Sequence, residues 1–395
     1  MRRHASRNQR RMGEHDAGHP WPVMQTRLGA HRAAWDALVE RLPLPSPFLR
    51  SWWFEHTAGP NPRFLLVLDG GTLLGGLALE EERWLGLPRL RVMGAGALCP
   101  DHLDIVALPG RDEDVLSALA AWLRQPGSRL LDLEGVAAGA RLAAALPGRV
   151  RREVVDVAPW VPLSTDPEDW LRARSRNFRS NLRKAANRFG NQGATYRVAR
   201  GDQVEAALAD LRRLHAARWG ARSRFLAAYD RFAAAAREGA ARGELAVHEL
   251  VADGTVVAAM GCLEVARRVS FYQSGWLPEH RWRNASTLLL AKVIEDACRR
   301  GFTEIDLLRG DEPYKHAFAS GRRELLRLRA SHGAAGHAAL AALTLASRSR
   351  RLASRALAAR RGAATATLTA GHHGRLDGGD AGARTPASAR PSSHR

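Results

Sequence analysis

Cysteine is scarce in this chain of 395 residues: Cys99, Cys262 and Cys298 are the only three, and they lie far apart. Their odd number and the absence of CxxC spacing exclude a disulfide framework and predict no metal site, so a reducing, cytoplasmic location is expected. A run of about 18 uncharged apolar residues is also missing, because the longest candidate, residues 64–79, contains Asp69 and four glycines. We therefore expect no integral membrane segment.

Lysine is nearly absent too, since 57 of the 60 basic residues are arginine. The formal net charge is +20, but residues 1–20 carry +3 of it and residues 321–395 carry +11, which leaves +6 for the body between them. Charge gathered at the ends of a chain attracts polyanions without reading bases. Nucleic acid is therefore not expected as the main partner, with charged tRNA as the one exception considered below.

Composition divides the chain into four parts. Both ends are polar, basic and of low complexity, whereas the body has the apolar patterning of globular domains. Pro159 and Pro162 bracket an extended stretch, where we place a domain boundary. The predicted parts are a disordered basic arm at 1–20, an N-terminal domain at 21–160, a C-terminal domain at 161–330 and a mostly disordered Ala/Arg-rich tail at 331–395.

Each predicted domain contains an apolar hairpin among amphipathic helices. In the first, residues 64–68 and 73–79 flank an Asp-Gly-Gly-Thr turn, and in the second, residues 245–251 and 256–263 flank an Asp-Gly turn. This repeated order predicts an α+β fold of two similar domains, each a mixed twisted sheet flanked by helices. The prediction rests on element order, because the residues themselves show no convincing repeat.

One segment near the end of the body carries the most chemical information. Its pattern predicts a strand at 269–275, a helix at 286–300 and a strand at 303–308. The loop before the helix contains arginine, asparagine and serine, and the free N–H groups at a helix start attract phosphate. The loop is thus a candidate pyrophosphate site, although a simple N-cap explains Asn284 or Ser286 as well.

Three runs in this segment resemble the GNAT superfamily of acyl-CoA-dependent N-acyltransferases, in its CelD/BioF-like branch. They are Tyr272–Trp276 (YQSGW), Thr287–Leu289 (TLL) and the most distinctive one, Asp306–Lys315 (DLLRGDEPYK). Supporting runs are Leu214–Trp219 (LHAARW) and, in the first domain, Ser46–Trp53 (SPFLRSWW), so that the resemblance extends over most of the body. It implies a pair of GNAT-like domains, similar to the architecture of Fem-type aminoacyl transferases.

The resemblance also implies that acetyl-CoA is the co-substrate, with its pantetheine arm between the splayed strands at 269–275 and 303–308. Its pyrophosphate would lie on the helix start, where family members carry a Ser-Pro-Gly run and this chain carries Asn-Ala-Ser. Glycine lets a backbone approach a phosphate closely, so the departure bears on the strength of binding. The implied cofactor-binding residues are Gln273, Gly275, Arg281, Asn284, Ala285, Ser286 and Thr287.

Acyl transfer needs an oxyanion donor, an acid for the leaving thiolate and a neutral amine. By resemblance, backbone N–H groups at 273–275 polarise the thioester carbonyl and Tyr314 protonates the thiolate, with strand pairing and aromatic packing as the respective alternatives. Asp306 and Glu264 are candidate bases, or else an anchor for Arg309 and a solvent-exposed carboxylate. The residues suggested for binding the acceptor are His215, Arg218, Trp219, Arg309 and Lys315.

The leading hypothesis is therefore acetyl transfer to an amine, on a small molecule or on a glycan- or lipid-linked precursor of the envelope or of a polysaccharide. A second hypothesis is aminoacyl transfer from charged tRNA, which the Fem-type similarity allows and the basic tail suits. A third is a double-GNAT module that binds a partner without catalysis. Binding of acetyl-CoA separates the first hypothesis from the other two.

Overall fold

The computed structural model describes residues 20–347 and residue 349. Residues 1–340 form one compact unit, and residues 341–395 form a second. The predicted basic arm, apart from Pro20, and the predicted tail from residue 350 on lie outside the described residues.

Helices and strands alternate along the first unit. Those of the first half are β1 Trp21–Gln25, α1 Arg32–Glu40, α2 Ser51–Thr57, β2 Pro62–Asp69, β3 Thr72–Trp84, β4 Leu87–Val92, β5 Val106–Ala107, α3 Asp112–Leu123, β6 Arg129–Ala137, α4 Leu142–Ala145 and β7 Arg151–Pro162. Those of the second half are α5 Pro167–Arg172, α6 Arg176–Asn191, β8 Thr195–Ala199, α7 Val204–Trp219, α8 Tyr229–Ala241, β9 Leu245–Ala252, β10 Thr255–Val265, β11 Arg268–Trp276, α9 Ala285–Arg299, β12 Glu304–Asp306, α10 Pro313–Phe318 and β13 Gly321–His332. Helical turns follow β13 over residues 334–347.

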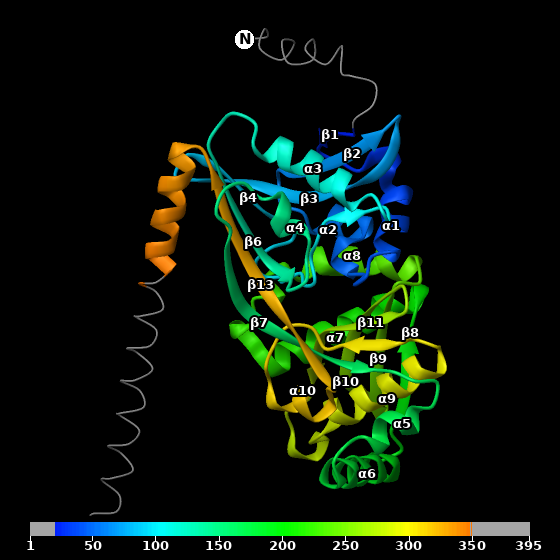
Figure 1. Ribbon diagram of the computed structural model, residues 1–395. Helices are drawn as coiled ribbons and strands as arrows, with labels where there is room; N and C mark the ends of the chain where they lie inside the picture. Colours follow the sequence, from blue (N-terminus) through cyan, green and yellow to red (C-terminus); the bar gives the residue numbers. More distant parts are fainter. Residues whose placement is uncertain (1–19, 348, 350–395) are drawn as a thin grey trace, which may run out of the picture. The chain divides into compact units, whose positions relative to one another are not determined.

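The 13 strands of the described residues belong to one sheet (Figure 1). Its order is β1-β2-β3-β4-β6-β13-β7-β12-β11-β10-β9-β8, with β5 attached to β3. The central strands β7 and β13 pair antiparallel, and β13 also pairs with β6 while β7 pairs with β12. The two halves therefore share a continuous sheet, and the boundary predicted at 160/161 falls inside β7.

The two halves repeat the same order of elements. The first runs β1-α1-α2-β2-β3-β4-α3-β6, and the second runs β8-α7-α8-β9-β10-β11-α9-β12. Corresponding pairs also have the same direction, since β4 and β6 pair in parallel just as β11 and β12 do, while the other pairs of each half are antiparallel. The predicted tandem α+β architecture is confirmed.

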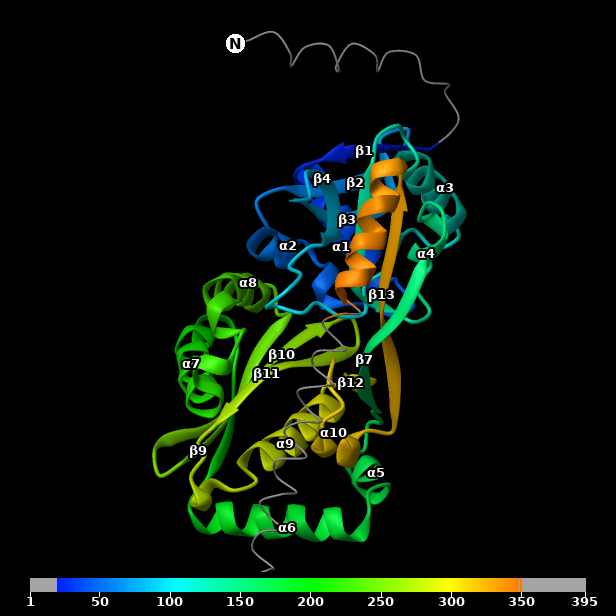
Figure 2. The same cartoon turned by 90° about the vertical axis from the view of Figure 1, so that its left-hand side faces the viewer.

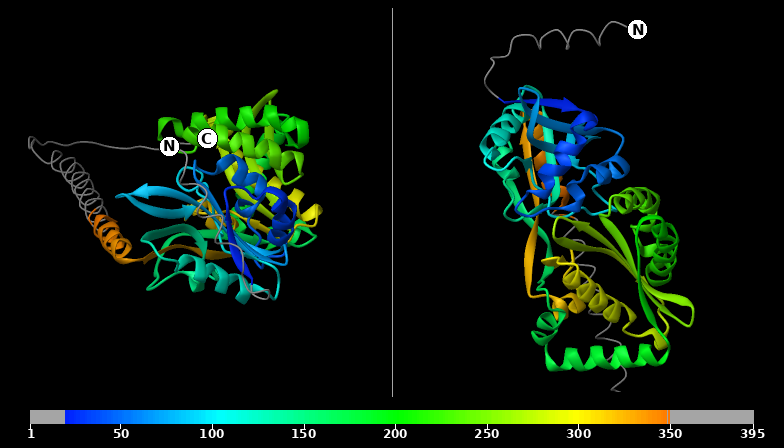
Figure 3. Two further views of the ribbon diagram at one scale, coloured as in Figure 1. Left: turned by 90° about the horizontal axis from the view of Figure 1, so that it is seen from above. Right: turned by 90° about the vertical axis from the view of Figure 1, so that its right-hand side faces the viewer.

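Helices cover both faces of the second half's strands (Figures 2 and 3). Side chains of a strand alternate between faces, so Leu263 of β10 packs in the same core as Leu211 of α7, while Cys262 packs in the core that contains Leu289 of α9. Helix α9 packs its apolar stripe against the strands. The helix ends at Arg299, and Gly301 shortly after it has a φ of 77°, which favours glycine. These two layers hold β11 and β12 rigidly where the site lies.

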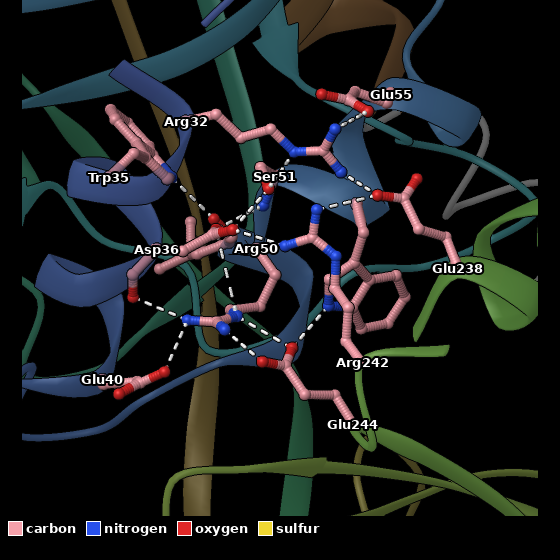
Figure 4. A network of polar contacts seen from close by, with 12 residues as sticks. Arg32, Trp35, Asp36, Glu40, Arg50, Ser51, Glu55, Glu238, Arg242 and Glu244 are labelled. Carbon is pink, nitrogen blue, oxygen red and sulfur yellow. Dashed lines mark hydrogen bonds and ion pairs between the residues drawn. The ribbon is translucent and has the colours of Figure 1, made fainter. Parts of the chain in front are cut away.

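Buried ion pairs join the two halves where α1 and α2 meet the end of α8 (Figure 4). The carboxylate of Glu244 accepts hydrogen bonds from both Arg50 and the indole N–H of Trp52, the latter at 2.6 Å. Arg242 donates to Asp36 at 3.0 Å across the same boundary. Because Arg50 is only 4% exposed, its charge depends on these partners, and the halves are tied into one unit.

Candidate active site

Strands β11 and β12 separate after a short parallel pairing. Their register covers only Arg268–Ser270 against Glu304–Asp306, whereas β11 continues to Trp276. On its other side β11 pairs with β10 through a bulge, because Gly261 faces Gln273 while Cys262 faces Phe271. A bulge leaves its extra residue out of the ladder and re-aims side chains, and it occurs often next to active sites. The far part of β11 thus has one backbone edge without a strand partner in the described residues.

A cavity of about 300 Å³ lies at this separation. Its walls come from residues 97–101 of the first half, from the end of α7 and the turn after it, from residues 271–274 of β11 and from residues 307–315 after β12. Segments distant in the sequence therefore converge on one space. Of the predicted site residues, the cavity is lined by Gln273, Tyr314, His215, Trp219, Arg309 and Lys315.

The bulged residue Tyr272 fastens this wall to the first half. Its hydroxyl donates to the carbonyl of Leu98 at 2.7 Å, and its ring lies 5.5 Å from the rings of both Phe48 and Trp53. Burial raises the pKa of Tyr272 well above its usual value, so the hydroxyl stays protonated. The first-half run SPFLRSWW thus contributes to the site through packing.

Asp306 anchors the loop that follows β12. It is fully buried, and its carboxylate accepts from the backbone N–H of Leu308 and from Arg268, each at 2.7 Å, and lies 2.7 Å from Nε2 of His102. Burial alone would raise the pKa of Asp306, but His102, Arg268 and the Leu308 N–H hold it below its usual value. Asp306 does not line the cavity, so of the two roles left open by the sequence the structure favours that of an anchor, with Arg268 and Leu308 as its partners.

The first half repeats this ion pair. Arg89 of β4 binds Asp132 of β6 just as Arg268 of β11 binds Asp306 of β12. Each arginine pairs across the sheet with the residue two positions before its aspartate. The repeat that was not visible in the sequence is therefore present at these positions in the fold.

Arg309 and Lys315 line the cavity but are already engaged by the protein. Arg309 donates to Asp101 at 2.7 Å and to Glu134 at 3.0 Å. The buried Lys315 donates to the carbonyl of Arg309 at 2.5 Å and pairs with Glu312 at 3.0 Å. These contacts hold the loop that presents Tyr314. Acceptor binding by Arg309 and Lys315 stays a prediction.

Tyr314 begins α10 and faces the cavity. The residue is 42% exposed, but desolvation by the surrounding protein and the charge of Glu312 raise the pKa of Tyr314, so it carries a proton at neutral pH. Within the described part of the chain no group forms a hydrogen bond with this hydroxyl. It is therefore available to a ligand in the cavity.

His215 connects α7 to β11 and to the turn after α7. Its Nδ1 lies 3.0 Å from the carbonyl oxygen of Ser274 and its Nε2 lies 2.8 Å from Oγ of Ser223. Burial lowers the pKa of His215, and the Ser274 hydrogen bond only partly opposes this. Gly275 makes the arrangement feasible, because a Cβ there would lie 2.2 Å from the His215 backbone nitrogen. Gly275 thus allows close packing of α7 on β11, and the cofactor binding expected of it stays a prediction.

Two further predicted site residues, Glu264 and Arg218, lie outside the cavity. Glu264 is buried and its carboxylate is bound by Arg200 and Arg300 at 2.7 to 2.9 Å, which lowers its pKa despite burial. Arg218 lies over the rings of Trp219 and Trp276, at 4.8 and 4.4 Å from their centroids. Neither residue lines the cavity, so the structure does not bring Glu264 to the reacting groups as a base.

The predicted pyrophosphate loop lies at the start of α9. Asn284 is the residue before the helix and has a left-handed φ of 68°, without a capping hydrogen bond from its side chain. Ala285 is buried, Ser286 and Thr287 are half-buried, and Arg281 pairs with Glu279 at 2.7 Å. None of these residues lines the cavity, and the phosphate role stays a prediction.

Ser223 is one of the cavity residues that sequence analysis missed. It lies in the turn after α7, within GARSRF, where a serine has no motif around it. Its oxygen accepts from the backbone N–H of Leu226 at 3.2 Å, as a capping serine does. Ser223 becomes a candidate site residue only because the structure places its Oγ 2.8 Å from Nε2 of His215.

Neither a metal-binding cluster nor a membrane-spanning helix is present among the described residues. No group of three or more histidine, cysteine, aspartate or glutamate side chains in the described part of the chain is placed to bind a metal ion. Within the same residues, no helix combines the length and apolarity needed to cross a membrane.

One comparison with known proteins matches the second half of the chain to a family. Residues 176–316 match the family described as an acetyltransferase (GNAT) domain, and the CelD/BioF-like resemblance is consistent with that match. No curated protein matches the chain.

Solved structures extend the likeness to both halves. The crystal structure of FemX superimposes with a TM-score of 0.56 at 12% identity, covering 77% of this chain and 96% of that one. The C-terminal domain of a putative lysylphosphatidylglycerol synthetase from Agrobacterium fabrum gives a TM-score of 0.52 at 12% identity, covering 79% and 95%. At such identity the likeness shows a shared fold.

Proposed function

Because this chain carries a GNAT acyltransferase domain, we propose that it transfers an acetyl group from acetyl-CoA to an amine in the cavity between β11 and β12. The observation that carries the proposal is the separation of these two parallel strands at a cavity whose walls present a free hydroxyl and a free backbone edge. Such convergence of a few polar groups in one concave space is typical of a small-molecule site.

Each chemical requirement of thioester aminolysis has a candidate group in this cavity. The unpaired edge of β11 beyond Ser270 offers backbone N–H groups for the carbonyl oxygen as it gains charge. Tyr314 offers a protonated hydroxyl for the departing thiolate. The start of α9, a helix of 15 residues, offers N–H groups and a positive dipole end for a pyrophosphate.

The acceptor would be an amine on a small molecule or on a glycan- or lipid-linked precursor. The side chains around the cavity allow an amine that brings its own polar groups, because Gln273 and Ser223 line it next to the aromatic rings of Trp219 and Phe225. Aromatic faces commonly bind sugar and aliphatic surfaces while leaving polar tips wet.

Titration calorimetry with acetyl-CoA, followed by release of free CoA thiol in the presence of amines, tests the proposal. Tyr314→Phe should bind acetyl-CoA as the wild type does and lose turnover by about 10²-fold or more, because a general acid acts only in the transition state. Tyr196→Phe is the matched control, since Tyr196 bonds His248 at 2.7 Å and lies outside the cavity. Absence of acetyl-CoA binding in the wild type would refute the proposal.

A second candidate is aminoacyl transfer from charged tRNA. FemX and lysylphosphatidylglycerol synthetase are aminoacyl transferases, and their likeness spans both halves of this unit. This likeness over both halves is the observation that supports the second candidate. Turnover that requires charged tRNA and ignores acetyl-CoA would establish it in place of the first proposal.

A further inference from the structure

We propose that Ser223 and His215 form a proton relay that removes the proton from the acceptor amine during acyl transfer. The inference rests on the proposed function, since it supplies the base that acyl transfer to an amine requires. It replaces the two carboxylates that the sequence suggested for this task.

The hydrogen bonds of His215 fix which of its nitrogens is the base. The carbonyl of Ser274 can only accept, so Nδ1 of His215 carries the hydrogen and donates it over 3.0 Å. In the neutral ring Nε2 then has a lone pair, and it lies 2.8 Å from Oγ of Ser223. This is the tautomer in which a serine hydroxyl donates to histidine.

Ser223 is oriented to pass a proton on. Its oxygen accepts the N–H of Leu226 at 3.2 Å, and its own hydrogen points to His215. A hydroxyl has two lone pairs, so one acceptor position of Ser223 stays open. Both side chains line the cavity that Tyr314 also lines, which places base and acid on the same space.

Other acidic groups at the cavity are held by cations. The charged side chains that share the cavity with His215 are Asp101, Glu312, Arg224, Arg309 and Lys315. Asp101 is fully buried against Arg309, and Glu312 pairs with Lys315 at 3.0 Å. Both carboxylates are therefore already engaged by a cation, whereas neutral His215 has a lone pair directed at a hydroxyl.

The relay balances protons and electrons as follows. An acceptor that arrives as an ammonium ion first gives one proton to Ser223 Oγ while the Ser223 hydroxyl proton passes to His215 Nε2. The neutral amine nitrogen then bonds to the thioester carbon and gives its next proton to solvent. The carbonyl electrons move to oxygen, return on collapse and break the C–S bond, and the thiolate takes the Tyr314 proton. The imidazolium of His215 then returns its proton through solvent to the Tyr314 phenolate.

The test compares Ser223→Ala with the wild type, using acetyl-CoA and two probe amines. Glucosamine is largely protonated at neutral pH and depends on a base, whereas hydroxylamine is largely neutral there. We expect Ser223→Ala to lose about 10²-fold in kcat/KM for glucosamine, to lose much less for hydroxylamine, and to keep acetyl-CoA affinity. Ser223→Thr, which keeps the hydroxyl, should restore the rate.

The chain supplies a matched control in a second serine–histidine pair. Ser331 Oγ lies 2.8 Å from Nδ1 of His337, away from the cavity, so Ser331→Ala breaks the same kind of bond and should leave both rates unchanged. A second readout is the ¹⁵N spectrum of His215. The spectrum should show the Nδ1–H tautomer of His215. The pKa of His215 should rise in Ser223→Ala, because the hydroxyl that is lost stabilised the neutral ring.

Different experimental outcomes would refute the proton relay and the proposed acetyl transfer. Acetyl transfer that survives Ser223→Ala at full rate, an Nε2–H tautomer, or an acyl group found covalently on Ser223 would each overturn the relay and leave the proposed function standing. A wild type that releases no CoA thiol with either amine would refute the proposed function, and the relay with it.

Discussion

Replacing Asp306 by asparagine separates two roles that the sequence left open. As a base, Asp306 would be needed for turnover and not for folding; as an anchor, it would be needed for stability first. The structure favours the anchor, because the carboxylate is fully buried and is surrounded by Arg268, His102 and the N–H of Leu308. Asparagine keeps the size and one acceptor oxygen but removes the negative charge that faces Arg268 and His102.

The size of the effect follows from these contacts. Removing one partner of a buried ion pair typically costs about 3–5 kcal/mol. Arg268 retains Glu304 at 2.9 Å and Leu308 retains an acceptor, so we expect the lower end, about 3 kcal/mol. With an unfolding entropy of about 2.1 cal/mol/K per residue over the 340 residues of the unit, this lowers Tm by about 4 °C.

Calorimetric melting at neutral pH, with thiol release measured on the same samples, gives both quantities. Asp132→Asn is the internal control, because Asp132 is the counterpart in the first half and is bound by Arg89, Arg327 and Arg329. It should lower Tm by a similar amount. If Asp306→Asn melted within 1 °C of the wild type and still lost turnover by 10²-fold, a general base would explain it and the anchor would be refuted.

Local pattern was sufficient for the elements around the site. The second hairpin was predicted at 245–251 and 256–263 and is β9 and β10, and the helix predicted at 286–300 is α9, displaced by one residue. These segments are predictable from the local sequence, because an Asp-Gly turn, an apolar stripe and a glycine after a helix each act over a few residues. The tandem fold followed from their order.

The central ribbon could not be obtained in this way. Strand β13 was divided by the boundary predicted at residue 330, and the end of β7, with its two prolines, was interpreted as an extended stretch at a domain boundary. Their pairing joins Leu325 to Asp156, so the contact is set by partners far away in the chain. The arginines of β13 look like the start of a basic tail until Asp132 appears beside Arg327 at 2.6 Å.

The site was predicted in part for the same reason. Tyr314 and Gln273 belong to family-like runs and do line the cavity, whereas Asp306 and Glu264 were chosen as carboxylates at strand ends without knowledge of their cations. Ser223 has no signal in its own neighbourhood, since its meaning comes from His215 on the preceding helix. Chemistry that depends on a pair becomes visible only when the fold has brought the pair together.

Three other perturbations have defined outcomes. Glu244→Gln should lower the free energy of unfolding in urea by about 3 kcal/mol because it leaves the buried Arg50 short of a carboxylate, whereas Glu205→Gln, in an exposed pair, should change it far less. Ser286→Asp should raise the Kd for acetyl-CoA about tenfold or more by repelling a pyrophosphate at α9, and the neutral Ser286→Asn should not; equal affinity in both would move the phosphate site elsewhere. Finally, Glu264 has a pKa below its usual 4.5, so the folded state binds fewer protons than the unfolded one and stability rises with pH. That contribution is complete above about pH 5 and is lost as the pH falls through the native pKa, so Glu264→Gln should be less stable than the wild type at pH 7 and should approach it at pH 3 in thermal melts. A constant difference between the two proteins from pH 7 to pH 3 would show that the charge of Glu264 does not stabilise the fold.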